Sequence, residues 1–395
     1  MAMATRKIGS TECVHSGVST CETTGSVAPP IVHSAPFTFE SIGAALDYLE
    51  GRSTRRQPEY GRMANPTVTC VESRLAALEG AEKAQLFASG MAAITTLLLC
   101  TLKSGDHVVL TSDCYKRTRD FCEGSLRKFG VTTSVVAPSL EAIEGAIGPA
   151  TRLVFTETPT NPFQYVVDIE GLAKLGRERG VLTVVDSTFA TPVYLRPLEF
   201  GIDLVVHSAT KYLGGHNDLI AGVAAGRAEL VQPISDLLAT LGGICDPTTA
   251  FLLGRGLKTL ALRMARHSAN GQAVAEFLEG HPRVRQVFYP GLVSHPHHAI
   301  AQKLMRAFGG VVTFLLDADR EGTARFVDRL TIPVLGPSLG GVESLVEQVI
   351  LFGYLDIPPE ERERFGMQDN LVRLSLGIED TEDIIADLQQ ALSDV

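Results

Sequence analysis

The sequence predicts an α/β protein with a mainly parallel central sheet flanked by helices, followed by a smaller α+β domain. Between residues 56 and 250, short runs rich in β-branched residues alternate with helical patterns, which is typical of βαβ units. Several runs are almost wholly apolar, as in strands covered on both faces. The chain of 395 residues is long enough for two domains. We expect an arm over residues 1–55, a large domain over 56–250 and a smaller domain over 251–395.

The first 55 residues are rich in Ser, Thr, Gly and Pro, and include Pro29-Pro30 and Pro36. Such composition predicts an extended segment rather than a packed layer. We expect this arm either to contact a partner subunit or to remain loose.

The predicted elements follow in order along the chain. Five strands are expected in the large domain: His107–Thr111, Val131–Ala137, Arg152–Thr158, Val181–Ser187 and Asp203–Ser208. A long helical pattern follows Phe251–Gly254. The smaller domain then has a strand Gly310–Leu316, a glycine-rich loop near Gly336–Gly341, a strand Val372–Leu376 and a final helix.

Composition excludes several classes of partner. The formal net charge is −10, and the one notable basic run is Lys116–Arg119, so neither nucleic acid nor an anionic membrane surface is expected. Seven scattered cysteines without C-x-x-C spacing predict reduced thiols. The longest apolar stretch, Met91–Leu102, is too short to span a bilayer, and the first residues lack a signal peptide's apolar core. We expect a cytoplasmic protein that acts on small polar substrates.

His295–His298 is rich in histidine but has no carboxylate or cysteine at useful spacing. We therefore expect an exposed structural loop there and no metal site.

The strongest chemical signal joins the ends of two predicted strands. Asp186 closes one strand and Lys211 directly follows the next. Ligands of open α/β sheets bind at the carboxyl ends of the strands. A carboxylate there can keep a pyridine nitrogen protonated, and a lysine can form a Schiff base with an aldehyde. Alone, each residue is more typical of a turn cap or a surface lysine; together they predict a pyridoxal phosphate site.

A phosphate site is expected nearby. The hydroxyls of Ser208 and Thr210 can donate to a phosphate, and the turn Ala88–Met91 opens an apolar helix whose N-terminus offers free N–H groups to an anion. A simple capped helix is the alternative interpretation of that turn.

Several longer motifs resemble the Cys/Met-metabolism family of pyridoxal phosphate enzymes, which have fold type I. They are Tyr60–Thr67, Glu157–Pro162, Asp186–Pro192, His207–His216 and Asp369–Asp380. The resemblance covers nearly the whole chain and is strongest to plant-type cystathionine γ-synthases.

The resemblance implies a role for each matching residue. Lys211 carries the cofactor and shuttles protons, Asp186 pairs with the ring nitrogen, and Tyr115 stacks on the ring as a second acid or base. The resemblance also implies a phosphate site. Its residues are Gly90, Met91, Ser208 and Thr210, together with Tyr60 and Arg62 of a neighbouring subunit. A site shared between subunits requires at least a dimer, and the resemblance implies a tetramer, the usual assembly of this family.

On the substrate side, the resemblance assigns the α-carboxylate to Arg373, whose guanidinium matches a carboxylate bidentately. Asn161 is expected at the cofactor ring oxygen or the substrate carboxylate. The loop Ser338–Ser344 resembles the substrate loop of cystathionine γ-synthases and γ-lyases, which puts Ser338 near the substrate and Glu343, helped by Glu59, at its distal ammonium. Solvated rim residues are the alternative for both glutamates.

Two further segments bear on the reaction. Lys116-Arg117 stands where many relatives have two glycines, and these cations, with Arg117 beside the substrate, favour an anionic leaving group such as phosphate. A surface ion-pair cluster is the competing explanation. In Val349–Tyr354 the chain departs from the family's usual Pro-Ala-hydrophobic-Met-Ser/Thr, which leaves the nucleophile open.

The expected reaction is γ-replacement on an activated L-homoserine ester, O-phospho- or O-acylhomoserine, with cysteine as nucleophile and cystathionine as product. Two enzymatic alternatives remain: a cystathionine or methionine γ-lyase, and a specialised enzyme that uses another nucleophile. A scaffold without activity would have no physical need for Lys211, Asp186, Tyr115 and Arg373 together.

Overall fold

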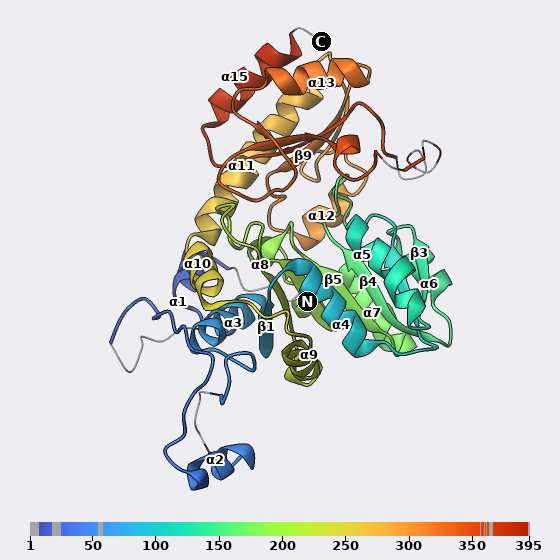
Figure 1. Cartoon of the computed structure of the whole chain (residues 1–395). Helices are drawn as coiled ribbons and strands as arrows, with labels where there is room; N and C mark the ends of the chain where they lie inside the picture. The colour runs from blue at the N-terminus through green and yellow to red at the C-terminus, as the bar shows by residue number, and fades with distance from the viewer. Residues whose placement is uncertain are drawn as a thin grey trace.

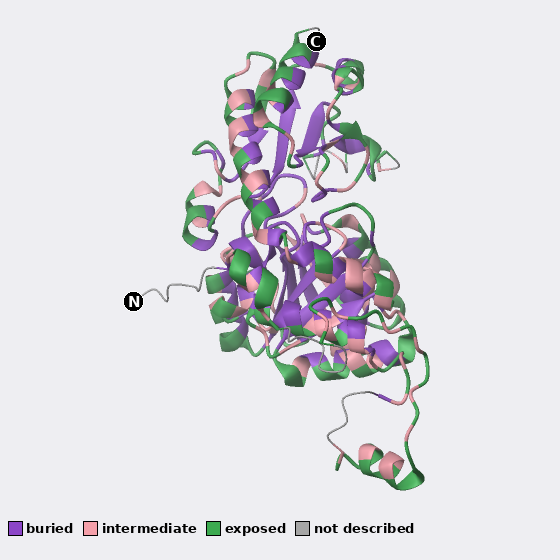
Figure 2. Cartoon of the chain, turned by 90° about the vertical axis from the view of Figure 1, so that its left-hand side faces the viewer, coloured by how far each residue is buried: buried purple, intermediate pink, exposed green. Residues whose placement is uncertain are grey.

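The computed structural model describes residues 8–17, 25–53, 58–355, 357–358, 360, 362 and 366–393. It contains two separate sheets, each with helices packed against it, and so confirms the predicted α/β class (Figure 1). Figure 2 shows that the strands of both sheets are buried, whereas the N-terminal segment is largely exposed.

The larger sheet has seven strands in the order β1-β7-β6-β5-β4-β2-β3. Strands β6, β5, β4, β2 and β3 are parallel, and β7 runs antiparallel to both β6 and β1. Their bounds are β1 Lys83–Phe87, β2 His107–Thr111, β3 Thr132–Val136, β4 Thr151–Glu157, β5 Leu182–Asp186, β6 Leu204–Ser208 and β7 Gly222–Gly226. All five predicted strands are present within one residue at each end, and β1 and β7 were not predicted.

Helices cover both faces of this sheet because its strands are apolar on both sides. Val205 packs in one apolar cluster with α3, α7 and α10, while Leu204 and Val206 pack in another with α4 and α9. The helices are α3 Pro66–Glu79, α4 Gly90–Thr101, α5 Lys116–Asp120, α6 Leu140–Ala146, α7 Ile169–Arg179, α8 Thr191–Tyr194, α9 Ala228–Leu241 and α10 Pro247–Leu257, with a π-helical turn Phe121–Leu126 and a 3-10 turn Pro197–Phe200.

The smaller sheet has five strands in the order β10-β11-β12-β9-β8, antiparallel except for β10 and β11. Its elements are α11 Leu260–Glu279, β8 Val284–Phe288, α12 His298–Leu304, β9 Val311–Leu316, α13 Arg320–Arg329, β10 Val334–Leu335, β11 Leu345–Gln348, a 3-10 turn Val349–Leu351, β12 Leu371–Ser375 and α15 Thr381–Leu392. The two predicted strands and the final helix match β9, β12 and α15; β8, β10 and β11 were not predicted.

The long helix α11 packs against both sheets. Leu260 and Met264, near the start of α11, pack in the cluster beneath the larger sheet, whereas Val274 and Leu278 pack against the smaller one. The proposed boundary at residue 250 stays a prediction.

The described part of the N-terminal segment contains α1 Ser10–His15 and α2 Ile42–Leu49. In Figure 1, α2 stands away from the rest of the molecule, and Ile42, Leu46 and Leu49 are exposed. Parts of the predicted arm, including residues 18–24, lie outside the described residues.

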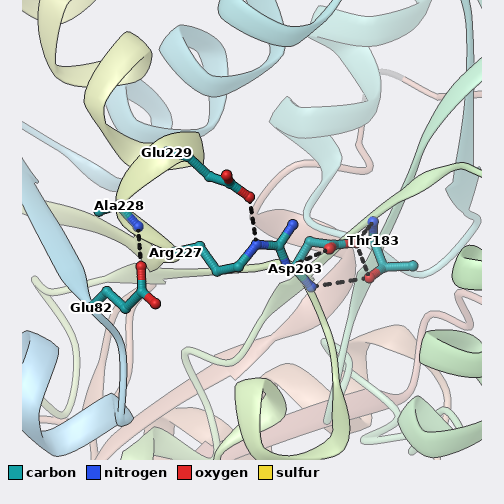
Figure 3. Close-up of polar contacts among 6 residues, drawn as sticks. All are labelled: Glu82, Thr183, Asp203, Arg227, Ala228 and Glu229. Carbon is teal, nitrogen blue, oxygen red and sulfur yellow. Dashed lines mark hydrogen bonds and ion pairs between the residues drawn. The ribbon is translucent and has the colours of Figure 1, made fainter.

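A polar network lies at the amino ends of the parallel strands β5 and β6, opposite their carboxyl ends (Figure 3). Arg227 lies 3.1 Å from Asp203 and 3.0 Å from Glu229, and Asp203 also accepts hydrogen bonds from the backbone and hydroxyl of Thr183. Glu82 accepts from the Ala228 N–H at 2.9 Å, at the N-terminus of α9, where a negative charge is favourable. These contacts hold β5, β6 and α9 in register at the end remote from the predicted site.

No cluster of possible metal ligands is found among the described residues. The prediction of an exposed loop is wrong for these side chains: His295 is buried, and His297 and His298 are half-buried. Each ring bonds a backbone group, of Phe163, Val166 and Pro290 respectively, which supports the structural role. Among the helices of the described part, none is long and apolar enough to cross a bilayer. Six of the cysteines are free thiols, and Cys21 lies outside the described residues.

Candidate active site

A cavity of about 420 Å³ lies at the carboxyl ends of β4, β5 and β6, closed on its far side by residues of the smaller layer. It brings together ten residues predicted from the sequence: Gly90, Met91, Tyr115, Asn161, Asp186, Ser208, Thr210, Lys211, Ser338 and Arg373. Its size falls in the usual range of small-ligand pockets, roughly 300–1,000 Å³.

Lys211 sits in a turn after β6, where its N–H donates to the Ser208 carbonyl at 3.1 Å. Its amine donates to the Ser338 hydroxyl at 2.6 Å. Burial, and to a lesser degree the nearby Arg373 charge, lowers the pKa of Lys211 to about 8. A larger fraction of the amine is therefore unprotonated, and able to act as nucleophile or proton acceptor, at neutral pH than in an exposed lysine.

Asp186 ends β5 and is buried. Its Oδ1 accepts from the Thr188 hydroxyl at 2.5 Å and from the Thr188 N–H at 3.0 Å. Burial raises the pKa of Asp186 above its ordinary value, although the Thr188 contacts oppose this. A cationic partner would restore the charged form, which suits a carboxylate that faces a protonated ring nitrogen.

The expected phosphate site joins segments far apart in the sequence. Ser89 caps α4 by accepting from the Ala92 N–H at 3.0 Å, and Gly90 begins the helix. A Cβ on Gly90 would lie 2.9 Å from the Ser208 Cβ, so only glycine lets the turn after β6 approach this helix N-terminus so closely. Thr210 adds a third hydroxyl. The cradle fits an anion.

Arg373, on β12, is buried and held from three sides. Its guanidinium donates to the Asn161 side-chain oxygen at 2.8 Å and to the Ser338 carbonyl at 2.9 Å, and lies 3.1 Å from the Glu347 carboxylate. Within the described residues its Nε has no hydrogen-bond partner. The side chain also lines the cavity.

Glu157 is a cavity residue that the sequence analysis did not select, although it opens one of the quoted motifs. It ends β4, directly opposite Asp186 across the β4–β5 ladder. Its carboxylate accepts from the Tyr115 N–H at 2.9 Å. Burial and the Asp186 charge raise the pKa of Glu157 well above its usual range, which favours the protonated carboxyl. Its position at a strand end, like that of Asp186, was the available signal.

Other lining residues were also missed. Glu347 faces Arg373 across β11 and β12, and Phe352 lies in the segment that departs from the family pattern. That departure was the signal for Phe352, whereas pairing between β11 and β12 could not be read from the sequence. The remaining ones are Ser89, Ile94, Thr188, Phe189, Ile220, Pro337 and Leu339.

Five predicted residues are not among those that line the cavity: Glu59, Tyr60, Arg62, Arg117 and Glu343. Tyr60 is exposed, with the Arg62 guanidinium 5.6 Å from its ring centre. Arg117 lies 3.4 Å from Asp120 on the same helix, the ion pair that was its competing explanation. Glu343 is exposed and accepts from the Asn217 amide at 2.8 Å. Their roles at the site stay predictions.

The donor set fits pyridoxal phosphate. A lysine amine, a buried carboxylate and a glycine-lined helix N-terminus surround one cavity, and each matches a different part of that molecule: aldehyde, ring nitrogen and phosphate. Tyr115, 46% exposed at the mouth, is placed to cover a ring.

Comparison with known proteins agrees with this chemistry. The family model for Cys/Met metabolism PLP-dependent enzymes matches residues 10–393. The chloroplastic cystathionine γ-synthase 1 of Arabidopsis thaliana is 47% identical over 371 residues, which are 93% of this chain and 66% of that protein, so the chain spans slightly less than two thirds of this relative. The L-methionine γ-lyase of Pseudomonas putida is 41% identical, with 97% of this chain and 96% of that protein covered.

Solved structures give the same result. The cystathionine γ-lyase of Lactobacillus plantarum, in complex with L-serine, superposes with a TM-score of 0.91 at 37% identity and 98% coverage of both chains. The structure of metB from Corynebacterium glutamicum gives a TM-score of 0.91 at 39% identity, with 97% of both chains covered. This chain therefore belongs to the Cys/Met metabolism family of PLP-dependent enzymes.

Proposed function

We propose that the enzyme catalyses γ-replacement on an activated L-homoserine ester, with cysteine as the nucleophile and L-cystathionine as the product. The proposal depends on one observation: Ser338 connects Lys211 with Arg373. The Ser338 hydroxyl accepts a hydrogen bond from the Lys211 amine, and the Ser338 carbonyl accepts one from Arg373. A proton-transfer group and a carboxylate-binding group are thereby set at a fixed separation. The identity to plant cystathionine γ-synthases supports the choice of reaction.

In the proposed reaction, each site residue has a separate role in substrate binding or proton transfer. Arg373, with Asn161, binds the substrate α-carboxylate and so presents the α- and β-carbons to the Lys211 amine. The Lys211 Nζ removes the α-proton, then a β-proton, and returns protons at the end of the cycle. Pyridoxal phosphate, when bound, supplies an electron sink for the negative charge that develops on the substrate. The Tyr115 hydroxyl serves as a second acid or base.

Loss of the γ-substituent makes the γ-carbon electrophilic, and a thiolate then adds there. We propose phosphate or an acyl group as the leaving group, with Lys116 and Arg117 near its exit. In the monomer both cations lie within 3.4 Å of Asp120, so this role requires an exchange of partners.

A second candidate is γ-substitution with a nucleophile other than cysteine. Phe352 places an aromatic ring in the cavity wall from the segment where the family usually has Pro-Ala-hydrophobic-Met-Ser/Thr. Glu343, the expected partner for the cysteine ammonium, bonds Asn217 instead. If no nucleophile adds and the γ-carbon is protonated instead, the product leaves as an enamine that water hydrolyses to an α-keto acid and ammonia, which is the γ-lyase reaction.

We also propose that Tyr60 and Arg62 complete the phosphate site of a neighbouring subunit in a homodimer or homotetramer, and that Glu59 lies beside that substrate. A cytoplasmic location is part of this proposal. Tyr60 is exposed and unattached to its own chain's cavity, which supports donation in trans.

The test is an assay of purified holoenzyme with O-phosphohomoserine, O-acetylhomoserine or O-succinylhomoserine, with and without cysteine. Cystathionine and α-keto acid are measured together. Cystathionine formed at the expense of keto acid supports γ-replacement, and the best ester identifies the leaving group. Keto acid that cysteine does not reduce favours the lyase or another nucleophile, and no turnover of any ester contradicts the proposal. Lys211→Ala is the inactive control.

A further inference from the structure

Lys211 projects from a turn over residues 209–215, the lysine turn, whose backbone is held by buried contacts. The Lys211 carbonyl accepts from the Gly215 N–H at 2.8 Å. The next residue, Tyr212, is 1% exposed, and its hydroxyl accepts from the Gly310 N–H at 3.3 Å. The position of the Lys211 amine therefore depends on the groups that fix this backbone from outside the cavity.

Arg263, near the start of α11, holds the lysine turn. Its Nη1 donates to the Tyr212 carbonyl at 2.7 Å and its Nη2 to the Gly256 carbonyl at 2.8 Å, while its Nε donates to the Thr259 hydroxyl at 3.1 Å. The residue is buried, and burial lowers its pKa to about 10, so the guanidinium stays charged at neutral pH. Hydrogen bonds from a charged donor are roughly twice as strong as those between neutral groups. The Tyr212 carbonyl is thus bound to α11 by a strong, buried contact.

Two glycines allow the close approach around this guanidinium. Gly215 has a φ of +74°, and a Cβ there would overlap the Arg263 guanidinium. A Cβ on Gly256 would overlap the Gly214 carbonyl. The lysine turn and the end of α10 therefore pack backbone against backbone, with Arg263 bound to both.

The next turn of α11 is bound to the strand that carries Arg373. Burial lowers the pKa of His267 to about 4, so its ring is neutral at pH 7, and its Nδ1–H donates to the Leu376 carbonyl, just after β12, at 2.7 Å. The same ring lies edge-on to that of Tyr212, with ring centres 5.1 Å apart. The helix α11 thus contacts both the lysine turn and the end of β12, and can fix one relative to the other.

We propose that Arg263 is a positioning residue for the proton-transfer amine: by binding the Tyr212 carbonyl, it fixes the backbone from which Lys211 projects. Arg263 is not among the residues that line the active-site cavity, so it acts through Lys211. A misplacement of about 1 Å can lower the rate of a chemical step by about a hundredfold. The inference rests on the part of the proposed function in which Lys211 takes the α-proton, and it does not depend on the leaving group or the nucleophile.

The test is exchange of the α-proton of L-2-aminobutyrate for deuterium in D₂O, measured by proton NMR with the holoenzyme. This amino acid has no γ-substituent, so exchange needs neither a leaving group nor a nucleophile. The Cα proton passes to the Lys211 Nζ, which exchanges its protons with solvent and returns a deuteron to the same carbon. Arg263→Met should lower the saturated exchange rate per bound cofactor by about tenfold or more. The half-saturating concentration should stay within about threefold, because Arg373 is unchanged.

Arg263→Lys keeps the charge and should recover part of the lost rate. Arg74→Met is the matched control. Arg74 is also 4% exposed, and its guanidinium donates to the carbonyls of Cys13 at 3.2 Å and Gly254 at 3.4 Å, which lie outside the lysine turn. This substitution should lower the free energy of unfolding as Arg263→Met does and leave the exchange rate per bound cofactor unchanged.

An equal fall in exchange in Arg74→Met and Arg263→Met would show a merely structural role and overturn the proposal. Should Arg263→Met fail to fold, Arg263→Lys decides, and a rate per cofactor equal to the parent's would contradict the proposal. Absence of exchange in the parent enzyme would refute Lys211 as the acceptor of the α-proton, and the proposal with it. Exchange by the parent without turnover of any homoserine ester would contradict the proposed γ-replacement alone.

Discussion

Glu347 lies directly opposite Arg373 across the antiparallel strands β11 and β12, with Oε1 3.1 Å from Nη2. Both side chains are buried, so each charge depends on the other for compensation. The same guanidinium is the proposed partner of the substrate carboxylate. Substrate binding therefore acts on an ion pair that the resting protein already contains.

Glu347→Gln should lower the free energy of unfolding by roughly 3 kcal/mol, because it leaves a buried guanidinium without its counter-charge. The measurement is urea denaturation of the holoenzyme. Asp317→Asn, which breaks the exposed pair with Arg285, is the matched control and should change stability by less than about 1 kcal/mol. Equal effects of the two substitutions would show that burial of the Glu347 pair has no energetic weight.

Without cofactor, the low pKa of Lys211, about 8, predicts how stability depends on pH. The unfolded chain has the ordinary lysine pKa near 10.4, so between these values it binds more protons than the folded chain, and stability rises with pH. The penalty for the buried charge is fully present below pH 8 and is lost by about pH 10.4, a gain of about 3 kcal/mol. Denaturation of apoprotein at several pH values should show this slope, and Lys211→Met should lack it.

Glu157 should act through its acceptor oxygens rather than its charge. Because burial raises its pKa well above the usual range, Glu157→Gln keeps the size, neutrality and acceptor, and kcat/KM should stay within about threefold of the parent. Glu157→Ala removes the acceptor for the Tyr115 N–H and should lower kcat/KM by about tenfold or more. If the glutamine variant were as impaired as the alanine variant, the carboxyl would have to be charged.

Phe352 should determine which thiol is accepted. Phe352→Met restores the residue type that the family pattern has at this position and should raise the preference for cysteine over a simple alkanethiol by about tenfold. The ratio of products from a mixture of both thiols measures this directly. Leu351→Met, in the same turn but outside the cavity lining, should leave the ratio unchanged. An unchanged product ratio in both variants would show that Phe352 does not determine which thiol the enzyme accepts.

Most of the larger sheet could be predicted because its central strands are long apolar runs, and Lys211 and Asp186 follow from their positions at strand ends. Strand β7, Gly222–Gly226, could not, since Gly-Val-Ala-Ala-Gly has low β propensity and forms a strand only because β1 and β6 pair with it on both sides. Glu347 was missed for a related reason: its partner Arg373 is brought opposite by pairing between segments that are distant in the sequence.

The places of Arg117 and Glu343 show a different limit. Their charges were visible in the sequence, but whether a charge faces a cavity depends on its neighbours: Asp120, one turn along the same helix, and Asn217, far away in the chain, already hold these two side chains. Tyr60 and Arg62 are proposed to act in a neighbouring subunit.

The helix α11 extends for 20 residues, about 30 Å, and its two ends cover different sheets. A gene cut at residue 250 would therefore not release two independent proteins. The C-terminal fragment would carry Leu253, Leu257 and Met264 as a bare apolar stripe, and the N-terminal fragment would lose the helices that shield α3. Each piece should aggregate when made alone, and the two should recover activity only when produced together, as halves that complete one another.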